Sequence, residues 1–139
     1  MKLLVIALML LSQVSCESET KLIYGDISSS SQRVRMALEM KRIPHELVNV
    51  KKYYDKDGFT KEYEKINPTK LIPALFIDGN WITETMAIIE YIEETRPYEP
   101  NILPKDFFLR AVSRRIAESV NSGIQPLQTS RVTSMIEEA

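Results

Sequence analysis

The fold of this protein is decided by the stretch KLIYGDISSSSQRVRMALEMKRIPHELVNV, residues 21–50. It opens with a short apolar run that a Gly-Asp pair ends, which predicts a strand and a turn. Apolar residues then recur at helical spacing, which predicts a helix over about residues 30–41, ending before Pro44. Residues 46–50 can form a second strand. Strand, helix and strand in about 30 residues make a βαβ unit with parallel strands.

Working outward, residues 51–58 read as a charged loop, and residues 59–66 as one or two helical turns. Residues 71–77 predict a loop and a buried strand, which a tight Asp-Gly turn joins to a short returning strand. A helix follows over residues 84–95, with Thr83 as a candidate cap. We therefore expect a small α/β domain with a mixed four-stranded sheet, in the order βαβ-α-ββα, over residues 17–98.

The remainder, residues 99–139, predicts helices only. Pro97, Pro100 and Pro104 mark a linker, and apolar residues then recur every four positions from Phe108 to Val120. The sequence predicts a helix over residues 105–122, broken by Gly123 and Pro126, and a second helix that starts near residue 131. One helix and a stub cannot close a core. They must pack on the first domain, on another subunit or on residues beyond this partial helical domain.

Residues 1–16 have the form of a secretory signal peptide, with a basic start, nine apolar residues from Leu3 to Leu11, and a small residue at Cys16. A membrane span needs about 20 apolar residues, so none is expected. A buried strand or helix, or a wrongly assigned gene start, is the alternative. The protein is thus expected to be secreted, the alternative being a cytoplasmic location.

Composition excludes several classes of protein. The chain has 18 basic and 19 acidic residues and a net charge of −1, which excludes a strongly basic nucleic-acid binder. One His and one Cys leave no set of metal ligands, so no metal is expected. The single Cys lies in the predicted signal. A thiol nucleophile in the mature protein would therefore have to come from a ligand.

The four serines Ser28, Ser29, Ser30 and Ser31 stand where the first strand turns into the first helix. Unpaired N–H groups there favour an anion, and serine hydroxyls can donate to a thiolate or an oxyanion. Ordinary helix capping is the alternative, and it is the commoner use of such serines.

Two further places suit a peptide ligand. Ile72-Pro73 precedes a strand, and a cis bond there would expose the backbone of Ile72 as an edge for an extended peptide. Only about 5–6% of X–Pro bonds are cis, so the residues alone favour an ordinary trans proline. Glu84 and Thr85 open a helix and suit the charged head of an amino acid. The alternative is an acidic first turn that complements the helix dipole.

Taken together, these sites resemble the glutathione transferase family, and within it the zeta class. The resemblance covers about residues 21–138. Four segments carry it in order: Ser28-Ser-Ser-Ser-Gln-Arg-Val-Arg35, Asn67-Pro-Thr-Lys-Leu-Ile-Pro-Ala-Leu75, Ala87-Ile-Ile-Glu-Tyr-Ile-Glu-Glu-Thr-Arg-Pro97 and Gly123-Ile-Gln-Pro-Leu-Gln128. The resemblance implies a thioredoxin-like N-terminal domain, followed by the start of an all-α domain that continues further in the family.

The resemblance also implies roles for single residues. Ser28, or else Ser29, activates the thiol of the cofactor glutathione, and Ser30 stands where the family has a cysteine. The main chain of Ile72, beside Pro73, pairs with glutathione, while Glu84 and Thr85 hold its γ-glutamyl group and Gln125 contacts it. The remaining residues implied at the glutathione site are Ser31, Gln32 and Arg33.

By helical spacing alone, Arg33 is an exposed charge. The implied reaction is thiolate addition to a small electrophilic carboxylic acid, as in maleylacetoacetate isomerisation, by a protein that is a homodimer when its helical domain is complete. A non-catalytic module that binds glutathione or a protein is the alternative.

Overall fold

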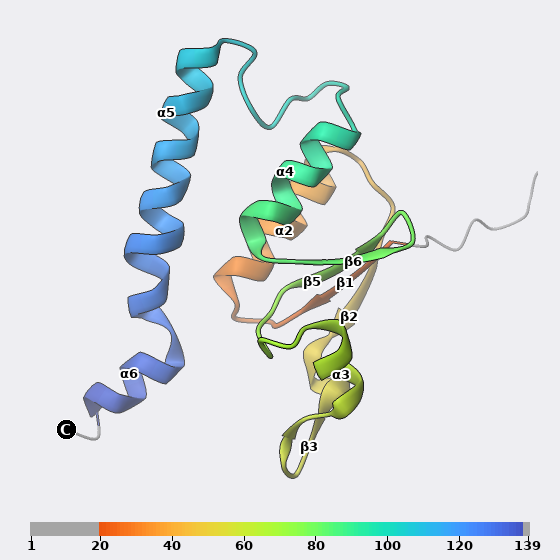
Figure 1. Cartoon of the computed structure of the whole chain (residues 1–139), viewed down its shortest axis with the longest axis vertical. Coiled ribbons are helices and arrows are strands. Elements are labelled where there is room, and N and C mark those ends of the chain that lie inside the picture. Colours follow the sequence, from red (N-terminus) through yellow and green to blue (C-terminus); the bar gives the residue numbers. More distant parts are fainter. Residues whose placement is uncertain (1–19, 138–139) are drawn as a thin grey trace, which may run out of the picture.

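A four-stranded mixed sheet is the centre of the molecule in the computed structural model, which describes residues 20–137. Its strands are β1 (Lys21–Tyr24), β2 (Glu46–Asn49), β5 (Ala74–Ile77) and β6 (Asn80–Thr83), in the order β2-β1-β5-β6. β2 is parallel to β1, and β5 is antiparallel to both β1 and β6 (Figure 1). The predicted mixed sheet is confirmed. The predicted signal, residues 1–16, lies outside the described residues.

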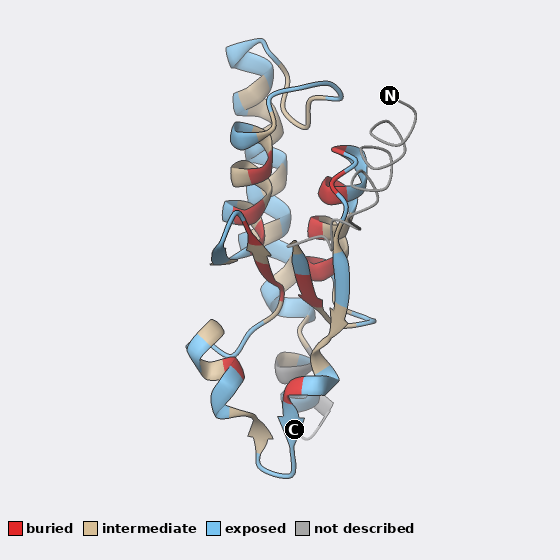
Figure 2. Ribbon diagram, turned by 90° about the vertical axis from the view of Figure 1, so that its right-hand side faces the viewer, coloured by how far each residue is buried: buried red, intermediate tan, exposed pale blue. Residues whose placement is uncertain are grey.

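Helices pack on both faces of this sheet, because side chains alternate between the faces along each strand. On one face Leu22 packs with buried residues of α2 (Ser29–Met40) and α4 (Thr85–Thr95). On the other face Ile23 packs with Tyr63 of α3 (Lys61–Ile66). Figure 2 shows the buried positions gathered on the strands and the inner sides of these helices.

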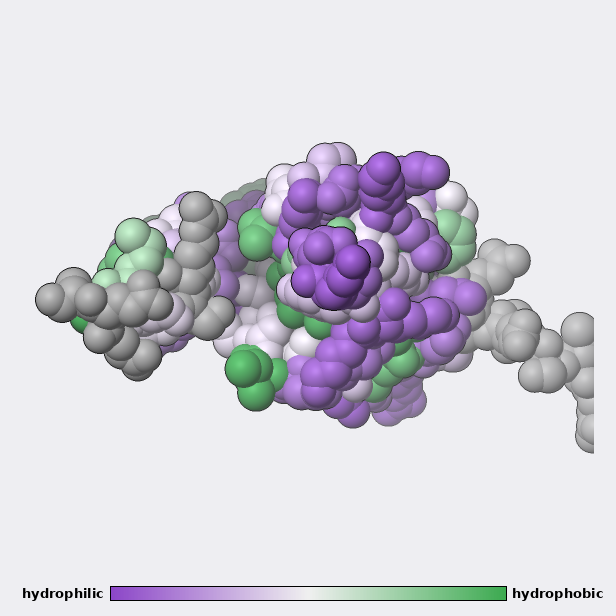
Figure 3. Space-filling view, turned by 90° about the horizontal axis from the view of Figure 1, so that it is seen from below, coloured by the Kyte–Doolittle hydropathy of each residue, from purple (hydrophilic) through white to green (hydrophobic). Residues whose placement is uncertain are grey.

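The predicted loop over residues 51–58 is instead ordered structure. A 3₁₀ turn, η1 (Val50–Tyr53), leads into a small hairpin of β3 (Tyr54–Asp55) and β4 (Gly58–Phe59). The rings of Tyr54 and Phe59 lie 4.2 Å apart, and Gly58 has a φ of 109°, which a non-glycine residue rarely adopts. The charged residues that suggested a loop cover the outside of this projecting part, which is strongly hydrophilic when seen from below (Figure 3).

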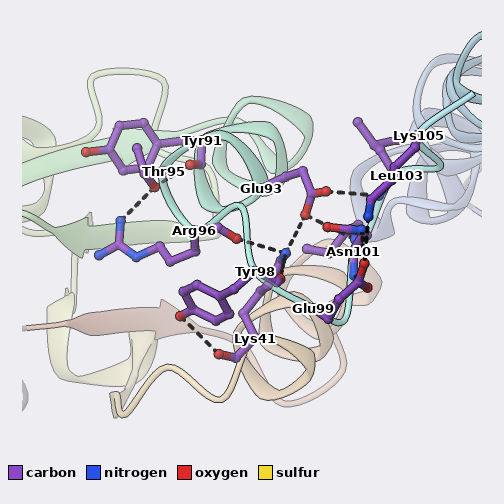
Figure 4. A network of polar contacts seen from close by, with 11 residues as sticks. Lys41, Tyr91, Glu93, Thr95, Arg96, Tyr98, Glu99, Asn101, Leu103 and Lys105 are labelled. Atoms are coloured by element: carbon purple, nitrogen blue, oxygen red, sulfur yellow. Dashed lines mark hydrogen bonds and ion pairs between the residues drawn. The ribbon is translucent and has the colours of Figure 1, made fainter. Parts of the chain in front are cut away.

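Lys41 ties the proline-containing linker to the domain (Figure 4). Its fully buried Nζ lies 2.7 Å from Glu93 Oε2 and donates to the carbonyl oxygens of Arg96 and Tyr98, at 2.9 and 2.8 Å. Lys41 continues the buried stripe of α2, so its charge enters the interior and needs these partners. As predicted, no helix or strand forms between residues 96 and 106.

The helical part differs from the prediction around Gly123 and Pro126, where the sequence predicted that the helix is broken. α5 (Phe107–Glu118) runs into a π-helical segment, η2 (Ser119–Ile124), and then a 3₁₀ turn, η3 (Gln125–Gln128), before α6 (Ser130–Glu137). Gly123 therefore does not end the helix, and Pro126 fits the first turn of η3, where its missing N–H is not needed. α5 buries no residue completely and stands beside the domain (Figures 1 and 2).

Within residues 20–137, no helix is both long and apolar enough to cross a membrane.

Candidate functional site

A cleft of about 550 Å³ lies between the α/β domain and the segment from η2 to α6. The α/β domain contributes residues from the start of α2, the loop before β5 and the start of α4, and the helical part contributes one wall. The lining residues are Ser30, Asn67, Leu71, Ile72, Pro73, Glu84, Thr85, Asn121, Gln125, Pro126, Thr129 and Val132. Five of the residues implied by sequence therefore line a single cavity together with Ser30.

The serine turn combines capping with a possible donor. Ser28 caps α2, since its Oγ accepts the N–H of Ser31 at 3.2 Å and the hydroxyl of Ser31 at 3.0 Å. Because Ser28 accepts in both bonds, its own hydroxyl proton is left to donate. Ser31 is buried and its Oγ also accepts the N–H of Gly25 at 3.4 Å, so it supports the turn from behind.

The other members of the turn lie differently from one another. Ser29 is exposed at the first position of α2, and Gln32 donates to the carbonyl of Asp26 at 3.4 Å. Neither lines the cleft. Ser30 is 7% exposed and does line it, although the family resemblance implied Ser28 or Ser29 for the chemistry.

Arg33 is not the exposed charge that helical spacing predicts. Its Nη2 donates to Ser30 Oγ and its Nη1 donates to Asn121 Oδ1, each at 3.2 Å. Burial lowers the pKa of the guanidinium, and its Nε is buried with no partner among the described residues. The long side chain thus bridges α2 and η2, which sequence spacing cannot show because the two are 88 residues apart.

The Ile72-Pro73 peptide bond is cis, which corrects the trans geometry that the residues alone favoured. Ile72 is half-buried and lines the cleft, and its backbone groups make no hydrogen bond within residues 20–137. This is the open backbone edge that an extended peptide could pair with.

Two residues that hold this edge escaped the sequence reasoning. The carbonyl oxygen of Leu71 accepts from Tyr63 Oη at 2.6 Å and from Asn67 Nδ2 at 2.8 Å. Both donors are buried, and burial raises the pKa of the Tyr63 hydroxyl, which keeps it protonated as a donor. Asn67 Oδ1 also accepts from Thr69, at 3.1 Å from the N–H and 2.8 Å from the hydroxyl. The asparagine directly before Pro68 was the sequence signal available for Asn67.

Glu84 and Thr85 stand at the start of α4, as predicted, but the cap is not Thr83. Glu84 occupies the cap position with a φ of 69° and no side-chain cap bond, so its exposed carboxylate is free to face the cleft. Thr85 is 6% exposed and opens into the cleft beside it. Gln125 of η3 lines the cleft, as predicted. Asn121 of η2 also lines it, although the sequence did not indicate this residue. The four-residue spacing of these two amides was the available signal.

The described residues hold no cluster of three or more His, Cys, Asp or Glu that could bind a metal. The polar groups of the site are instead hydroxyls, amides, one carboxylate and an open backbone edge, all suited to a polar organic ligand.

Residues 27–95 match the family description "Glutathione S-transferase, N-terminal domain". The chain belongs to the glutathione S-transferase family, and its N-terminal domain has the thioredoxin-like fold of that family.

The relatives of this chain point to one class within the family. The chain is 47% identical over 112 residues to maleylacetoacetate isomerase of Mus musculus, covering 78% of this chain and 50% of that protein. A solved maleylpyruvate isomerase, described as a bacterial zeta-class glutathione S-transferase, superposes with a TM-score of 0.75 at 30% identity, covering 85% of this chain and 55% of the other.

Maleylacetoacetate isomerase of Anaeromyxobacter dehalogenans, solved with glutathione in its active site, superposes with a TM-score of 0.69 at 35% identity, covering 86% of this chain and 56% of the other. This chain therefore spans about half the length of the relatives that it matches.

Proposed function

We propose that this protein binds glutathione in the cleft and uses it as a zeta-class transferase or isomerase acting on a small electrophilic carboxylic acid. The observation that carries the proposal is the meeting of Ser30, the cis Ile72-Pro73 edge, Glu84-Thr85 and Gln125 at one cavity. Relatives that are 47% and 35% identical to this chain are named maleylacetoacetate isomerase.

The residues present fit glutathione, a γ-glutamyl tripeptide. The unpaired backbone of Ile72 can hold the middle of an extended peptide, as an added strand would. The Glu84 carboxylate can accept from an ammonium group, and the start of α4 with Thr85 can donate to a carboxylate. Gln125 offers amide contacts from the opposite wall.

Bound glutathione supplies the sulfur nucleophile that adds to the electrophile. The serine turn would keep that sulfur ionised: Ser28, two residues before the cleft-lining Ser30, can donate its hydroxyl proton, and the N–H groups at the start of α2 carry partial positive charge. Donors to a thiolate lower its pKa and raise the fraction that is reactive at neutral pH. Ser29 remains the second candidate for this donor.

Turnover of maleylacetone with glutathione tests the proposal. Ser28→Ala should abolish most turnover and also destabilise α2 by about 1 kcal/mol, because the cap is lost. Ser28→Asp separates the two effects, since aspartate caps a helix as well as serine but cannot donate at neutral pH. We expect Ser28→Asp to fold normally and to be inactive. Full activity in Ser28→Asp together with loss in Ser29→Ala would assign the donor to Ser29 instead.

A non-catalytic module that binds glutathione or a protein is the second candidate. One observation favours it: among the described residues, the helical part lines the cleft only between residues 121 and 132. Both candidates predict retention on immobilised glutathione. Binding without turnover of maleylacetone or a chloroacid would select the module, and failure to bind would remove both.

Assembly and location complete the proposal. We expect a homodimer when the helical domain is complete, which sedimentation analysis of the native protein would show. We also propose that residues 1–16 direct secretion, or else that the protein is cytoplasmic as in its family. Secreted protein whose N-terminal residue is Glu17 would establish the former.

A further inference from the structure

Arg33 determines how two cleft residues present their hydrogen-bonding groups. A guanidinium only donates, so Ser30 Oγ and Asn121 Oδ1 must both accept from it. Ser30 is then left with its hydroxyl proton, and Asn121 with its amide NH₂. Both residues line the cleft, so Arg33 turns two groups that could accept or donate into donors at its wall.

No carboxylate among the described side chains neutralises the charge behind these donors. Arg33 forms no ion pair with the residues whose side chains the structure describes, and its buried Nε has no partner there. Removal from water lowers the pKa of the guanidinium, as expected of a cation without an acid beside it. A half-buried cation without a carboxylate partner among the described side chains favours an anion nearby.

The backbone brings the second donor into position. Asn121 lies in the π-helical segment η2, a geometry that is rare in helices and frequent at functional sites. Glu84 is the acidic residue among those that line the cleft, and it belongs to a different element, the start of α4. The cleft thus has an acidic group on α4 and a cation-backed pair of donors on α2 and η2.

We propose that Ser30 and Asn121, oriented by Arg33 as a positioning residue, form a carboxylate-binding subsite of the cleft. The carboxylate comes either from glutathione itself or from the small acid that reacts with it. The inference rests on the proposed function, because it assigns part of the same cleft.

The variant Asn121→Asp tests this directly. It is nearly isosteric, and it replaces the NH₂ donor by a second carboxylate oxygen while giving Arg33 an acid partner. If Arg33 and Asn121 only hold the two parts together, the new ion pair preserves stability and ligand binding alike. If they form the subsite, stability is kept while carboxylate affinity falls at least tenfold.

Binding is measured by NMR titration of the full chain with succinate and, separately, with glutathione. Arg33→Gln should also lose at least tenfold in affinity, and Ser30→Ala severalfold. Arg35→Gln removes the same charge two residues further along α2, where no contact to the cleft exists in the described structure, and should leave both affinities unchanged. Thermal unfolding of each variant verifies that it is folded.

The two ligands separate the sources and the hypotheses. Loss confined to succinate assigns the subsite to the second substrate, and loss confined to glutathione assigns it to that molecule's own carboxylate. Unchanged binding of both ligands in folded Asn121→Asp and Arg33→Gln overturns the inference but leaves the proposed function standing. Wild-type protein that binds succinate but not glutathione overturns the proposed function alone, and protein that binds neither overturns both.

Discussion

At the scale of the residue, hydrogen bonds to one carbonyl oxygen fix the open backbone edge at Ile72. Leu71 O accepts from Tyr63 and Asn67 directly before the Ile72-Pro73 bond. These two buried side chains therefore fix the position of the backbone at Ile72. Their contribution differs, because Tyr63 makes one bond while Asn67 also anchors Thr69.

Tyr63→Phe removes one hydrogen bond and keeps the ring. We expect the free energy of unfolding to fall by about 1 kcal/mol, since the Leu71 carbonyl keeps its bond to Asn67. Asn67→Ala should cost more, about 2–3 kcal/mol, because it leaves several buried groups without partners. Urea denaturation checks both values. Equal losses in the two variants would contradict the view that the carbonyl is shared.

The buried ammonium of Lys41 supports a second prediction. Lys41→Met leaves the carboxylate of Glu93, which is largely shielded from solvent, without its cation. We therefore expect the free energy of unfolding to fall by ~3–5 kcal/mol. The double variant Lys41→Met/Glu93→Leu removes both charges and should recover much of that loss. A double variant as unstable as the single one would show that packing, and not charge, dominates at this position.

At the scale of the element, the helices fall into two groups by burial. α2 and α4 bury apolar stripes against the sheet, whereas α5 buries no residue and its apolar side chains Phe107, Phe108 and Ile116 are all more than half exposed. The polar contacts of α5 and η2 with the domain include Arg114–Glu90 and Arg33–Asn121. An exposed ion pair contributes little to stability, so α5 is held to the domain by weak interactions.

Hydrogen exchange of the isolated chain should therefore separate these elements. We expect the amides of α5 to open with a smaller free energy than those of α4, because few buried contacts resist local unfolding of α5. Amide exchange followed by NMR gives both values under the same conditions. Equal protection in α4 and α5 would mean that the apolar face of α5 is covered in solution, for example by a second subunit.

At the scale of the whole molecule, acid stability reflects several carboxylates. Burial alone would raise the pKa of Glu93, but hydrogen bonds from Lys41 and from the N–H groups of Ile102 and Leu103 outweigh it and lower this pKa. The Arg96 guanidinium similarly lowers the pKa of Asp78. A carboxylate with a lowered pKa stabilises the fold above its unfolded pKa, and that contribution is lost as the pH falls through its folded pKa.

We therefore expect the free energy of unfolding to decline below about pH 4.5, the ordinary pKa of a glutamate. In Glu93→Gln the decline should be shallower and the stability at neutral pH lower. Glu94→Gln, which changes the exposed neighbouring carboxylate, serves as the control and should keep the wild-type profile. Urea midpoints between pH 3 and 7 check this, and identical profiles for both variants would contradict the role given to Glu93.

The sequence alone determined the elements and the class of site. Hydrophobic periodicity and turn residues are local signals, so the βαβ unit, the hairpin of β5 and β6, and the helices α4 and α5 were predictable. The β3–β4 hairpin was not predictable, because its charged residues suggested a loop and the packing of its rings is not visible in the sequence. The π-helical segment was not predictable either, because Gly123 suggested a helix end.

Only the tertiary structure decided which groups meet. It brought Asn121 to Arg33, placed Ser30 on the cleft wall while Ser28 caps the helix, and joined Tyr63 and Asn67 to one carbonyl. These contacts depend on the mutual placement of separate elements in space. Residue spacing along one element reports the face that a side chain occupies, but not its partner on another element.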